Sequence, residues 1–428
     1  MKSVATPTEL TAAIVMADIA FILLVAHLFG GIARRLGQPV VIGEIIAGIA
    51  LGPSLLGLLP GDLTHVLFPT AARPYLSAIS QVGLLLFMFL IGWEFDRSMI
   101  ARRKTLTLSV SVSSIALAFT LGIGLAGIIY HRHSTVAGKH VPFLAFALFL
   151  GAAMAITAFP VLARILRDRR LSHTPLGMLA LASAAIDDVL AWCILAVVAA
   201  VATARDTTDL IQVVLMSACY VAVMALVVRP ALAALVRRIG PNTYQLAAIT
   251  AAGVFLSSYA TTWVGIHAIF GAFAFGFVMP RQPVEPLSKH IRVPFENIGL
   301  VLLPVFFIVT GLGVDIAALT VTNFLELAAI ILVACLGKMA GATLPARAFG
   351  LPWRDARRLG ILMNTRGLTE LIVLNIGVSL SVLDSQMFTM MVIMALVTTA
   401  MAGPLLQSHT PSHEDAPTMP TEALQTSR

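Results

Sequence analysis

The chain has 428 residues, of which 58% are hydrophobic and only 11% are charged, and its mean hydropathy is +0.93. These values exclude an ordinary soluble domain, because soluble domains carry charge on about a quarter of their residues. Long apolar runs recur from about residue 10 to residue 406, which predicts an all-α polytopic membrane protein.

The apolar runs predict about thirteen membrane-spanning helices in one transmembrane domain, residues 1–406. The polar residues 407–428 are rich in Pro, Ser and Thr, and we expect them to form a short disordered tail. The predicted spans are 10–33, 39–59, 75–95, 105–130, 141–166, 174–203, 209–229, 243–262, 264–280, 294–313, 321–345, 356–380 and 385–406.

Positive side chains gather in alternate connections between these spans. Twenty Lys and Arg residues fall in one set of connections, whereas the other set holds only Arg73, Arg132, Lys139 and Arg205. Cytoplasmic loops carry the excess of Lys and Arg, so we expect the N-terminus outside and the C-terminus in the cytoplasm. The expected location is the plasma (inner) membrane. The same alternation favours an odd number of spans and explains the net charge of +7 without an acidic partner.

Three short strings in the first half recur in the same order in the second half. IGEIIAGIALGP resembles FGAFAFGFVMP, LFMFLIGWEFD resembles VFFIVTGLGVD, and AITAFPVLARIL resembles MNTRGLTELIVL. The matched spans enter the membrane from opposite sides, so the repeat is inverted, which is typical of secondary transporters. A chance match between short apolar strings is the alternative.

Two adjacent carboxylates lie inside the apolar run 174–201. Asp187 and Asp188 stand where an ionisable group costs several kcal/mol and usually lines an ion or proton path. Neighbouring residues on a helix point about 100° apart, so the two need not do the same job. Lys338, alone in ILVACLGKMAGATL, is the predicted partner of one of them, and a static ion pair between two helices is the alternative.

Two further spans are interrupted at corresponding positions of the repeat. Thr157 and Pro160 interrupt the fifth span, and the twelfth contains Asn364, Thr365, Arg366, Gly367 and Glu370. Irregular polar segments at matching positions predict a midplane binding site, where backbone carbonyls and the Thr157 hydroxyl would coordinate a cation. A simple kink at Pro160 is one alternative. Mutual neutralisation of Arg366 and Glu370, four residues apart, is another.

The chain resembles the monovalent cation:proton antiporter-2 superfamily, within the sodium/hydrogen exchangers, at six places. These are RLGQPVVIGEIIAGIALGPSLLG, LLLFMFLIGWEFD, AFPVLARIL, AIDDVLAW, GIHAIFGAFAFGFVMPR and MNTRGLTELIVLNIG. The group includes NapA-like sodium/proton antiporters, Kef-type potassium efflux systems and plant cation/proton exchangers. The resemblance implies thirteen helices, a homodimer, and a core domain in which two discontinuous helices cross.

The same resemblance implies roles for individual residues. Asp188 would bind the cation or a proton, Asp187 would pair with Lys338, and exchange would be electrogenic. We therefore predict exchange of Na⁺ or Li⁺ for protons, with K⁺/H⁺ exchange or export of a small organic cation as alternatives. A channel or sensor is a more distant alternative. No nucleophile–base set or metal-ligand cluster suggests an enzyme, and the expected partners are the transported ions and the bilayer, with no cofactor and no nucleic acid.

Overall fold

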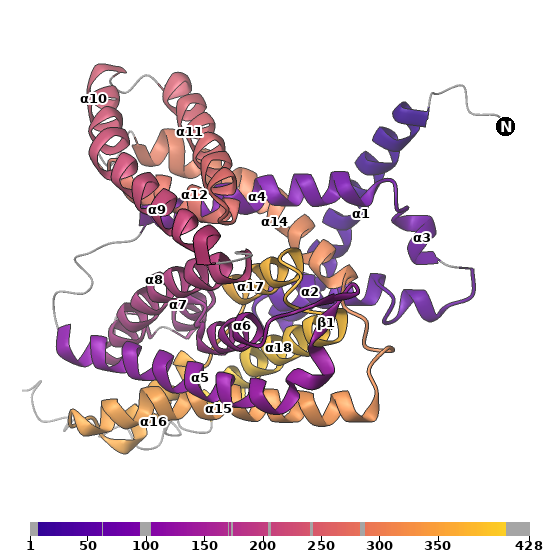
Figure 1. Ribbon diagram of the computed structural model, residues 1–428, viewed down its shortest axis with the longest axis vertical. Helices are drawn as coiled ribbons and strands as arrows, with labels where there is room; N and C mark the ends of the chain where they lie inside the picture. The colour runs from indigo at the N-terminus through magenta and orange to yellow at the C-terminus, as the bar shows by residue number, and fades with distance from the viewer. Residues whose placement is uncertain are drawn as a thin grey trace, which may run out of the picture.

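The computed structural model describes residues 7–61, 63–94, 104–169, 171–172, 174–203, 207–239, 243–282 and 287–407. Helices make up most of this part of the chain (Figure 1). Among the described residues, strands occur only in a two-stranded antiparallel hairpin, β1 (Thr135–Val136) and β2 (Lys139–His140). Nearly all of the predicted tail, 407–428, lies outside the described residues.

The long helices follow the predicted spans closely, and shorter pieces join them. The elements are α1 (Pro7–Arg35), α2 (Val40–Leu51), η1 (Leu56–Leu58), α3 (Leu63–Leu67), α4 (Arg73–Glu94), α5 (Lys104–His133), α6 (Phe143–Ala155), α7 (Phe159–Asp168), α8 (Pro175–Thr203), α9 (Thr207–Val223), η3 (Met224–Val228), α10 (Arg229–Ile239), α11 (Thr243–Val264), α12 (Ala268–Val278), η4 (Ser288–Arg292), α14 (Val293–Leu312), α15 (Val321–Ala348), α16 (Trp353–Met363), α17 (Leu368–Ser379) and α18 (Ser385–Gln407).

Local sequence sets where several of these helices begin. Pro39, Pro142 and Pro352 directly precede α2, α6 and α16, where a missing amide proton costs nothing and the fixed φ suits the chain's entry. Thr320 and Asn323 form a reciprocal capping box at the start of α15, which satisfies two amides that a helix N-terminus otherwise leaves unpaired.

The protein is a multi-pass membrane protein. The described residues contain eleven helices long and apolar enough to span a bilayer, or twelve if the bent pair α16–α17 is one span. The short apolar helix α12 occupies the place of the ninth predicted span. The prediction of thirteen spans therefore stays a prediction, while the helical class is confirmed.

Helices from the two halves of the chain pack on each other, and each packs on the repeat counterpart of its neighbour. α2 packs on α14, and α4 packs on α12. Small residues allow these contacts: a Cβ on Gly48 would lie 2.9 Å from the Gly311 Cα, and one on Gly276 would clash with the Phe89 carbonyl. An exchange of partners between halves is what the proposed inverted repeat would produce.

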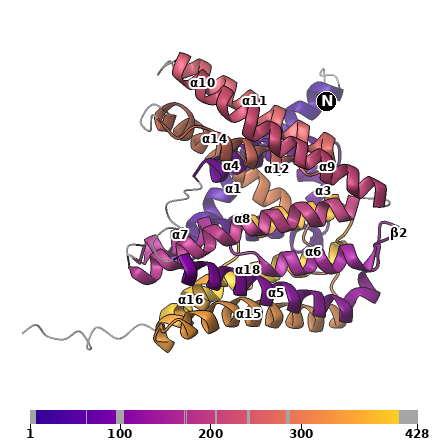
Figure 2. The same cartoon turned by 60° about the vertical axis from the view of Figure 1, so that its left-hand side comes forward.

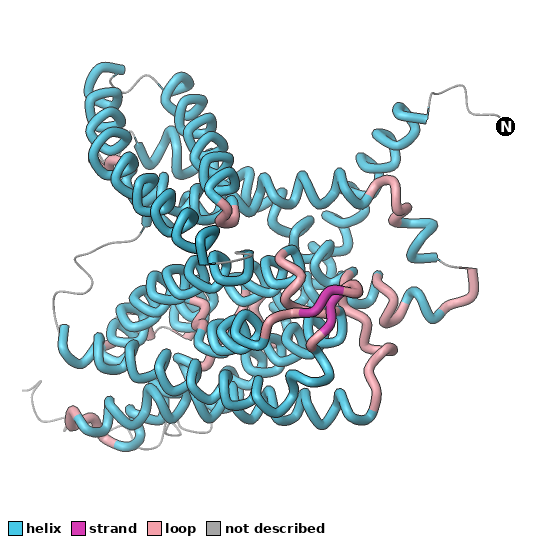
Figure 3. Tube along the Cα trace, in the orientation of Figure 1, coloured by secondary structure: helices cyan, strands magenta, loops and turns pink. Residues whose placement is uncertain are grey.

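Two outer groups of helices lie on either side of a buried central group. α9, α10, α11 and α12 lie together at one end of the molecule, and α5, α15 and α16 lie at the opposite end (Figures 1 and 2). Between them lie α6, α7, α8, α17 and α18, and the span made by α6 and α7 is the most buried of the apolar spans. Figure 3 shows loop segments, drawn in pink, among the helices of this central group.

Candidate ion-exchange site

The first interruption separates α6 from α7. α6 ends at Ala155 and α7 begins at Phe159, with Ile156 and Ala158 in extended conformations between them. Pro160 lies in the first turn of α7, where proline is favoured because the amide it lacks would have no helical partner. Pro160 thus helps to start a second helix rather than kinking a continuous one.

The second interruption separates α16 from α17 and contacts the first. α16 ends at Met363 and α17 begins at Leu368, with a bend of 42° between the two helices. The Ala158 amide donates to the Thr365 carbonyl over 3.0 Å, so the two irregular segments are joined directly. Gly367 permits this approach, because a Cβ there would lie only 2.5 Å from the Val161 side chain.

Asp187, on α8, is fully buried and surrounded by donors. Lys338 Nζ lies 2.7 Å from Asp187 Oδ2, and the Thr157 hydroxyl donates to the same oxygen over 2.9 Å. Ser111 of α5 donates to Oδ1 through a short hydrogen bond. The structure therefore brings Lys338 to Asp187, and it directs Thr157 toward Asp187 and the Met363 carbonyl, 3.0 Å away. Coordination of a cation by Thr157 stays a prediction.

Asp188 has a different environment from its neighbour. Its side chain is 5% exposed, and Oδ1 has no hydrogen-bond partner among the described residues. The amide of Phe159, the first residue of α7, donates to this carboxylate. A helix N-terminus carries a partial positive charge, so α7 supports an anion at this point without supplying a full counter-charge.

The side chains of Lys338 and Arg366 are buried at the C-terminal end of α6. Lys338 Nζ donates to the Ala155 carbonyl over 2.8 Å, while Arg366 donates to the carbonyls of Ala153 (2.7 Å) and Met154 (2.6 Å). These carbonyls end α6, where the helix dipole is negative and favours cations. Arg366 also lies 2.9 Å from Glu370 in the first turn of α17.

Buried polar atoms without partners concentrate on α8, the second break and the start of α17. More than nine in ten buried polar groups in proteins are hydrogen-bonded. A local concentration of unpaired polar atoms therefore indicates a place where water or a ligand binds. Among the described residues, these atoms are Ser183 Oγ, Asp188 Oδ1, Trp192 Nε1, Asn364 Oδ1, Arg366 Nε, Thr369 Oγ1 and Glu370 Oε1. Most are oxygens, which are the ligands that hard cations such as Na⁺ accept.

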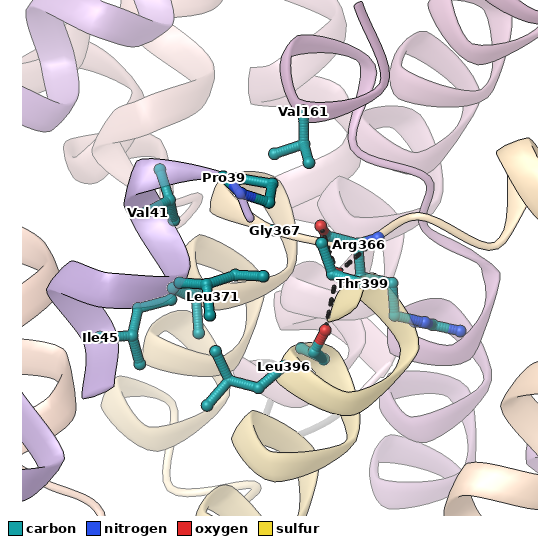
Figure 4. Close-up of a pocket in the computed structure, with 11 residues that line it drawn as sticks. Pro39, Val41, Ile45, Val161, Arg366, Gly367, Leu371, Leu396 and Thr399 are labelled. Carbon is teal, nitrogen blue, oxygen red and sulfur yellow. Dashed lines mark hydrogen bonds between the residues drawn. The ribbon is translucent and has the colours of Figure 1, made fainter. Parts of the chain in front are cut away.

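A narrow cleft separates α2 from the second break. Val41, Ile45, Leu371 and Leu396 give it apolar walls, and Arg366 borders it with its backbone while its guanidinium points away (Figure 4). Thr399 fixes that backbone: its hydroxyl accepts from the Arg366 amide at 3.1 Å. The cleft therefore separates two largely apolar surfaces close to the charged centre.

A second polar cluster, the His133 cluster, consists of Arg132, His133, Asn323, Glu326 and Asp384. His133 Nδ1 lies 2.6 Å from Asp384 Oδ2, and Nε2 lies 3.2 Å from Glu326 Oε2. Arg132 donates to Glu326 Oε1 over 2.7 Å and Asn323 to Oε2 over 3.2 Å. The cluster joins the end of α5 to the starts of α15 and α18.

Asp384 lies outside the membrane-spanning segments, just before α18. Burial opposes its ionisation, but hydrogen bonds from His133 and from the Met387 amide outweigh burial and hold the pKa of this carboxyl below its ordinary value.

Sequence patterns identified Asp187, Asp188, Lys338 and both interrupted segments, and the structure brings these together. Sequence reasoning missed Ser111, because α5 carries serines at 109, 111, 113 and 114 and no pattern separates one from another. It also missed the α6 carbonyls that bind Lys338 and Arg366, because the sequence of side chains does not show which backbone carbonyls are left free where a helix ends.

The family model for the transmembrane sodium/hydrogen exchanger matches residues 20–408 of the chain. The chain is 40% identical to the "Na(+)/H(+) antiporter NhaS4" of Synechocystis over 401 residues, covering 92% of this chain and 97% of that protein. It is 36% identical to "Cation/H(+) antiporter 20" of Arabidopsis thaliana and 32% identical to "K(+)/H(+) antiporter 1" of Saccharomyces cerevisiae. The chain spans 49% and 45% of those two proteins.

The fold is similar to that of a solved antiporter. The sodium proton antiporter MjNhaP1 from Methanocaldococcus jannaschii matches with a TM-score of 0.65 over 93% of this chain and 97% of that chain, at 13% sequence identity. At that identity the likeness bears on the fold alone.

Proposed function

Since this chain belongs to the transmembrane sodium/hydrogen exchanger family, a family of antiporters rather than enzymes, we propose that it exports Na⁺ or Li⁺ in exchange for protons. The observation that carries the proposal is the contrast between the two aspartates. Asp187 is neutralised by Lys338, whereas Asp188 keeps a buried carboxylate oxygen that has no partner among the described residues.

The mechanism is competition at Asp188. A monovalent cation and a proton are alternative partners for one carboxylate, so a proton that binds from one side displaces the cation on the other. Unpaired oxygens on α8, the second break and α17 would supply the remaining ligands, with water completing the shell. No resident cofactor takes part in the proposed cycle.

The Asp187–Lys338 pair is the second titratable unit in this proposal. If the pair also exchanges a proton during the cycle, two protons enter for each cation exported and one net charge moves inward. The membrane potential then contributes about 2.3 kcal/mol per charge per 100 mV, which favours export.

Alternating access requires the bound site to face each side in turn. We propose that the helices around the breaks move as a core against α2 and its neighbours in a homodimer in the plasma membrane, with the N-terminus outside. The apolar walls of the cleft beside Arg366 suit such a movement, although the hydrogen bond from the Gln38 side-chain amide to the Ala400 carbonyl (3.4 Å), which joins the two sides, would have to break.

A K⁺/H⁺ exchanger on the same scaffold is the second candidate. It is favoured by the resemblance to the yeast protein named for that exchange. Export of a small organic cation is a more distant alternative.

The test is proton flux into proteoliposomes that contain a pH-sensitive dye, with the membrane potential clamped. Na⁺, Li⁺ and K⁺ are added in turn, and protein-free liposomes are the control. Proton movement driven by Na⁺ or Li⁺ and altered by voltage supports electrogenic exchange. A response to K⁺ alone moves the assignment to K⁺/H⁺ exchange, and no response to any of the three contradicts the proposal.

A further inference from the structure

Two arginines and a tryptophan lie together where α15 ends and α16 begins, away from the candidate ion-exchange site. The guanidinium carbon of Arg347 lies 5.5 Å from the centre of the Trp353 ring, and that of Arg357 lies 5.7 Å from it. Guanidinium groups are attracted to the face of an indole ring at such distances. These three residues are called the Trp353 cluster below.

The turn between α15 and α16 brings the three side chains together. The Gly350 amide donates to the Arg347 carbonyl over 3.0 Å, and Gly350 has a φ of +90°, which glycine adopts without strain. The chain therefore reverses within a few residues, and the Arg347 guanidinium donates to the Leu351 carbonyl over 3.1 Å. On α16, Trp353 and Arg357 are separated by one helical turn, so they lie on the same face.

The cluster holds two positive charges near one ring and has no counter-charge of its own. Neither Arg347 nor Arg357 forms an ion pair in the part of the chain that the structure describes, and Asp355, in the same turn of α16, pairs with Arg358 at 3.8 Å instead. The ring attracts both cations but leaves their charges in place, so the two arginines repel each other. An anion between them would remove this repulsion.

The cluster is also open to a ligand. The side chains of Arg347 and Arg357 are exposed, and Trp353 is half exposed. Phosphate is the anion that suits them best, because a planar guanidinium can give one phosphate group two parallel hydrogen bonds.

The position of the cluster favours a lipid over a water-soluble anion. α15 is long and apolar enough to cross a bilayer, and Arg347 lies in its last turn. The exposed side chains of Leu332 and Leu336 lie on the same face of α15, about three to four turns before Arg347. This face lies at the outer edge of the molecule (Figures 1 and 2). A phospholipid lying along it would place its acyl chains on the leucines and its phosphate at the cluster.

We infer that the Trp353 cluster binds the headgroup of an anionic phospholipid in the leaflet on the expected cytoplasmic side. Arg347 and Arg357 bind the phosphate, and Trp353 holds both guanidiniums at the depth where tryptophan is enriched in membrane proteins. The inference goes beyond the proposed function and does not depend on which ions are exchanged. Because α15 carries Lys338 and α16 leads to the second break, the lipid would attach the ends of both helices to the headgroup layer.

The test measures, by native mass spectrometry, how much phospholipid the purified full chain retains in detergent. Anionic phosphatidylglycerol and zwitterionic phosphatidylcholine are titrated separately. The site variant is Arg347→Gln with Arg357→Gln. The matched control is Arg237→Gln with Arg238→Gln, which removes the same charge from exposed arginines in the last turn of α10.

The wild type should retain phosphatidylglycerol at lower concentration than phosphatidylcholine. In the site variant, the half-saturating concentration of phosphatidylglycerol should rise at least about tenfold, the effect expected for losing one hydrogen bond between charged groups. In the control it should change less than about twofold, as for an ordinary exposed charge. Excess inorganic phosphate should leave the lipid bound, because it lacks acyl chains to contact α15.

Three outcomes would overturn the inference. Equal retention of the two lipids by the wild type would show no preference for an anionic headgroup. Equal losses in the site variant and the control would indicate general attraction to basic surfaces. Displacement by inorganic phosphate would assign the cluster to a free anion.

A milder variant keeps the test decisive if the double variant does not fold. Arg357→Gln is then used alone, because the Arg357 guanidinium has no hydrogen bond or ion pair among the described residues that folding would lose. A half-saturating concentration equal to that of the wild type would refute the site.

Discussion

The midplane site and the His133 cluster contain the same kinds of groups but differ in how completely they are paired. In the His133 cluster each carboxylate oxygen of Glu326 and Asp384 has a hydrogen-bond donor, which for Asp384 Oδ1 is the backbone amide of Met387. At the midplane, one oxygen of Asp188 and one of Glu370 have no partner among the described residues. Both regions join distant helices, so joining helices does not distinguish them.

The difference shows which cluster has room for a ligand. A buried polar group without a partner destabilises the fold by about 1–3 kcal/mol. Such a group is expected where a bound ion, proton or water satisfies it in the working protein. The His133 cluster is complete without further partners, which suits a fixed tie between helices. The midplane site is incomplete, which suits an ion or proton that comes and goes.

Removing the Asp188 carboxylate, which has an unpaired oxygen, should have the largest effect on cation-driven proton flux. Asp188→Asn keeps the size of the side chain but removes the charge that binds a cation, so cation-driven proton flux should fall to the level of protein-free liposomes. The folded protein should remain in the membrane, because no hydrogen bond to Asp188 Oδ1 is lost. Flux that survives in this variant would refute the role of Asp188.

Removing one partner of the buried pair should have a large effect on stability. Lys338→Ala leaves Asp187 charged and buried without its counter-charge, and breaking such a pair costs about 3–5 kcal/mol. Thermal unfolding in detergent measures the loss, and Lys338→Ala with Asp187→Asn should recover part of it. A single variant as stable as the wild type would show that the pair contributes nothing.

The His133 cluster should respond to acid through Asp384. Because the folded-state pKa of Asp384 is depressed, its stabilisation is present above about pH 4, the unfolded value, and is lost as the pH falls below it. Asp384→Asn should therefore lower the unfolding temperature at pH 7 while flattening its decline in acid. Equal acid sensitivity in variant and wild type would contradict the assignment.

The exposed edge of the same cluster should matter least. Arg132 is 61% exposed although it bonds buried Glu326, and exposed ion pairs contribute about 0–1 kcal/mol. Arg132→Ala should change the unfolding temperature little and leave cation-driven flux unchanged. A loss as large as that of Lys338→Ala would mean that completeness of pairing does not separate the two regions.

The sequence predicted the membrane fold and the charged centre because both depend on residue type. Lys338 stands out in an apolar run, and Pro160 and Gly367 mark interruptions by their chemistry. The partners of Asp187 were harder to predict, since Ser111 depends on how closely α5 approaches α15. The carbonyls of Ala153 and Met154 could not be predicted, because any residue supplies the same group.

The buried centre also has consequences for leakage. Three acidic side chains, Asp187, Asp188 and Glu370, meet two basic ones, Lys338 and Arg366, and none of the five is more than 5% exposed. When all are ionised, the empty centre carries one uncompensated negative charge, which the first proton or a Na⁺ cancels before the Asp187–Lys338 pair takes up the second proton of the proposed exchange. Carrying that surplus through a medium of low dielectric costs several kcal/mol, so we expect the unloaded protein to return only rarely. The uncompensated charge alone would then prevent the empty carrier from changing sides and dissipating the gradient that drives exchange.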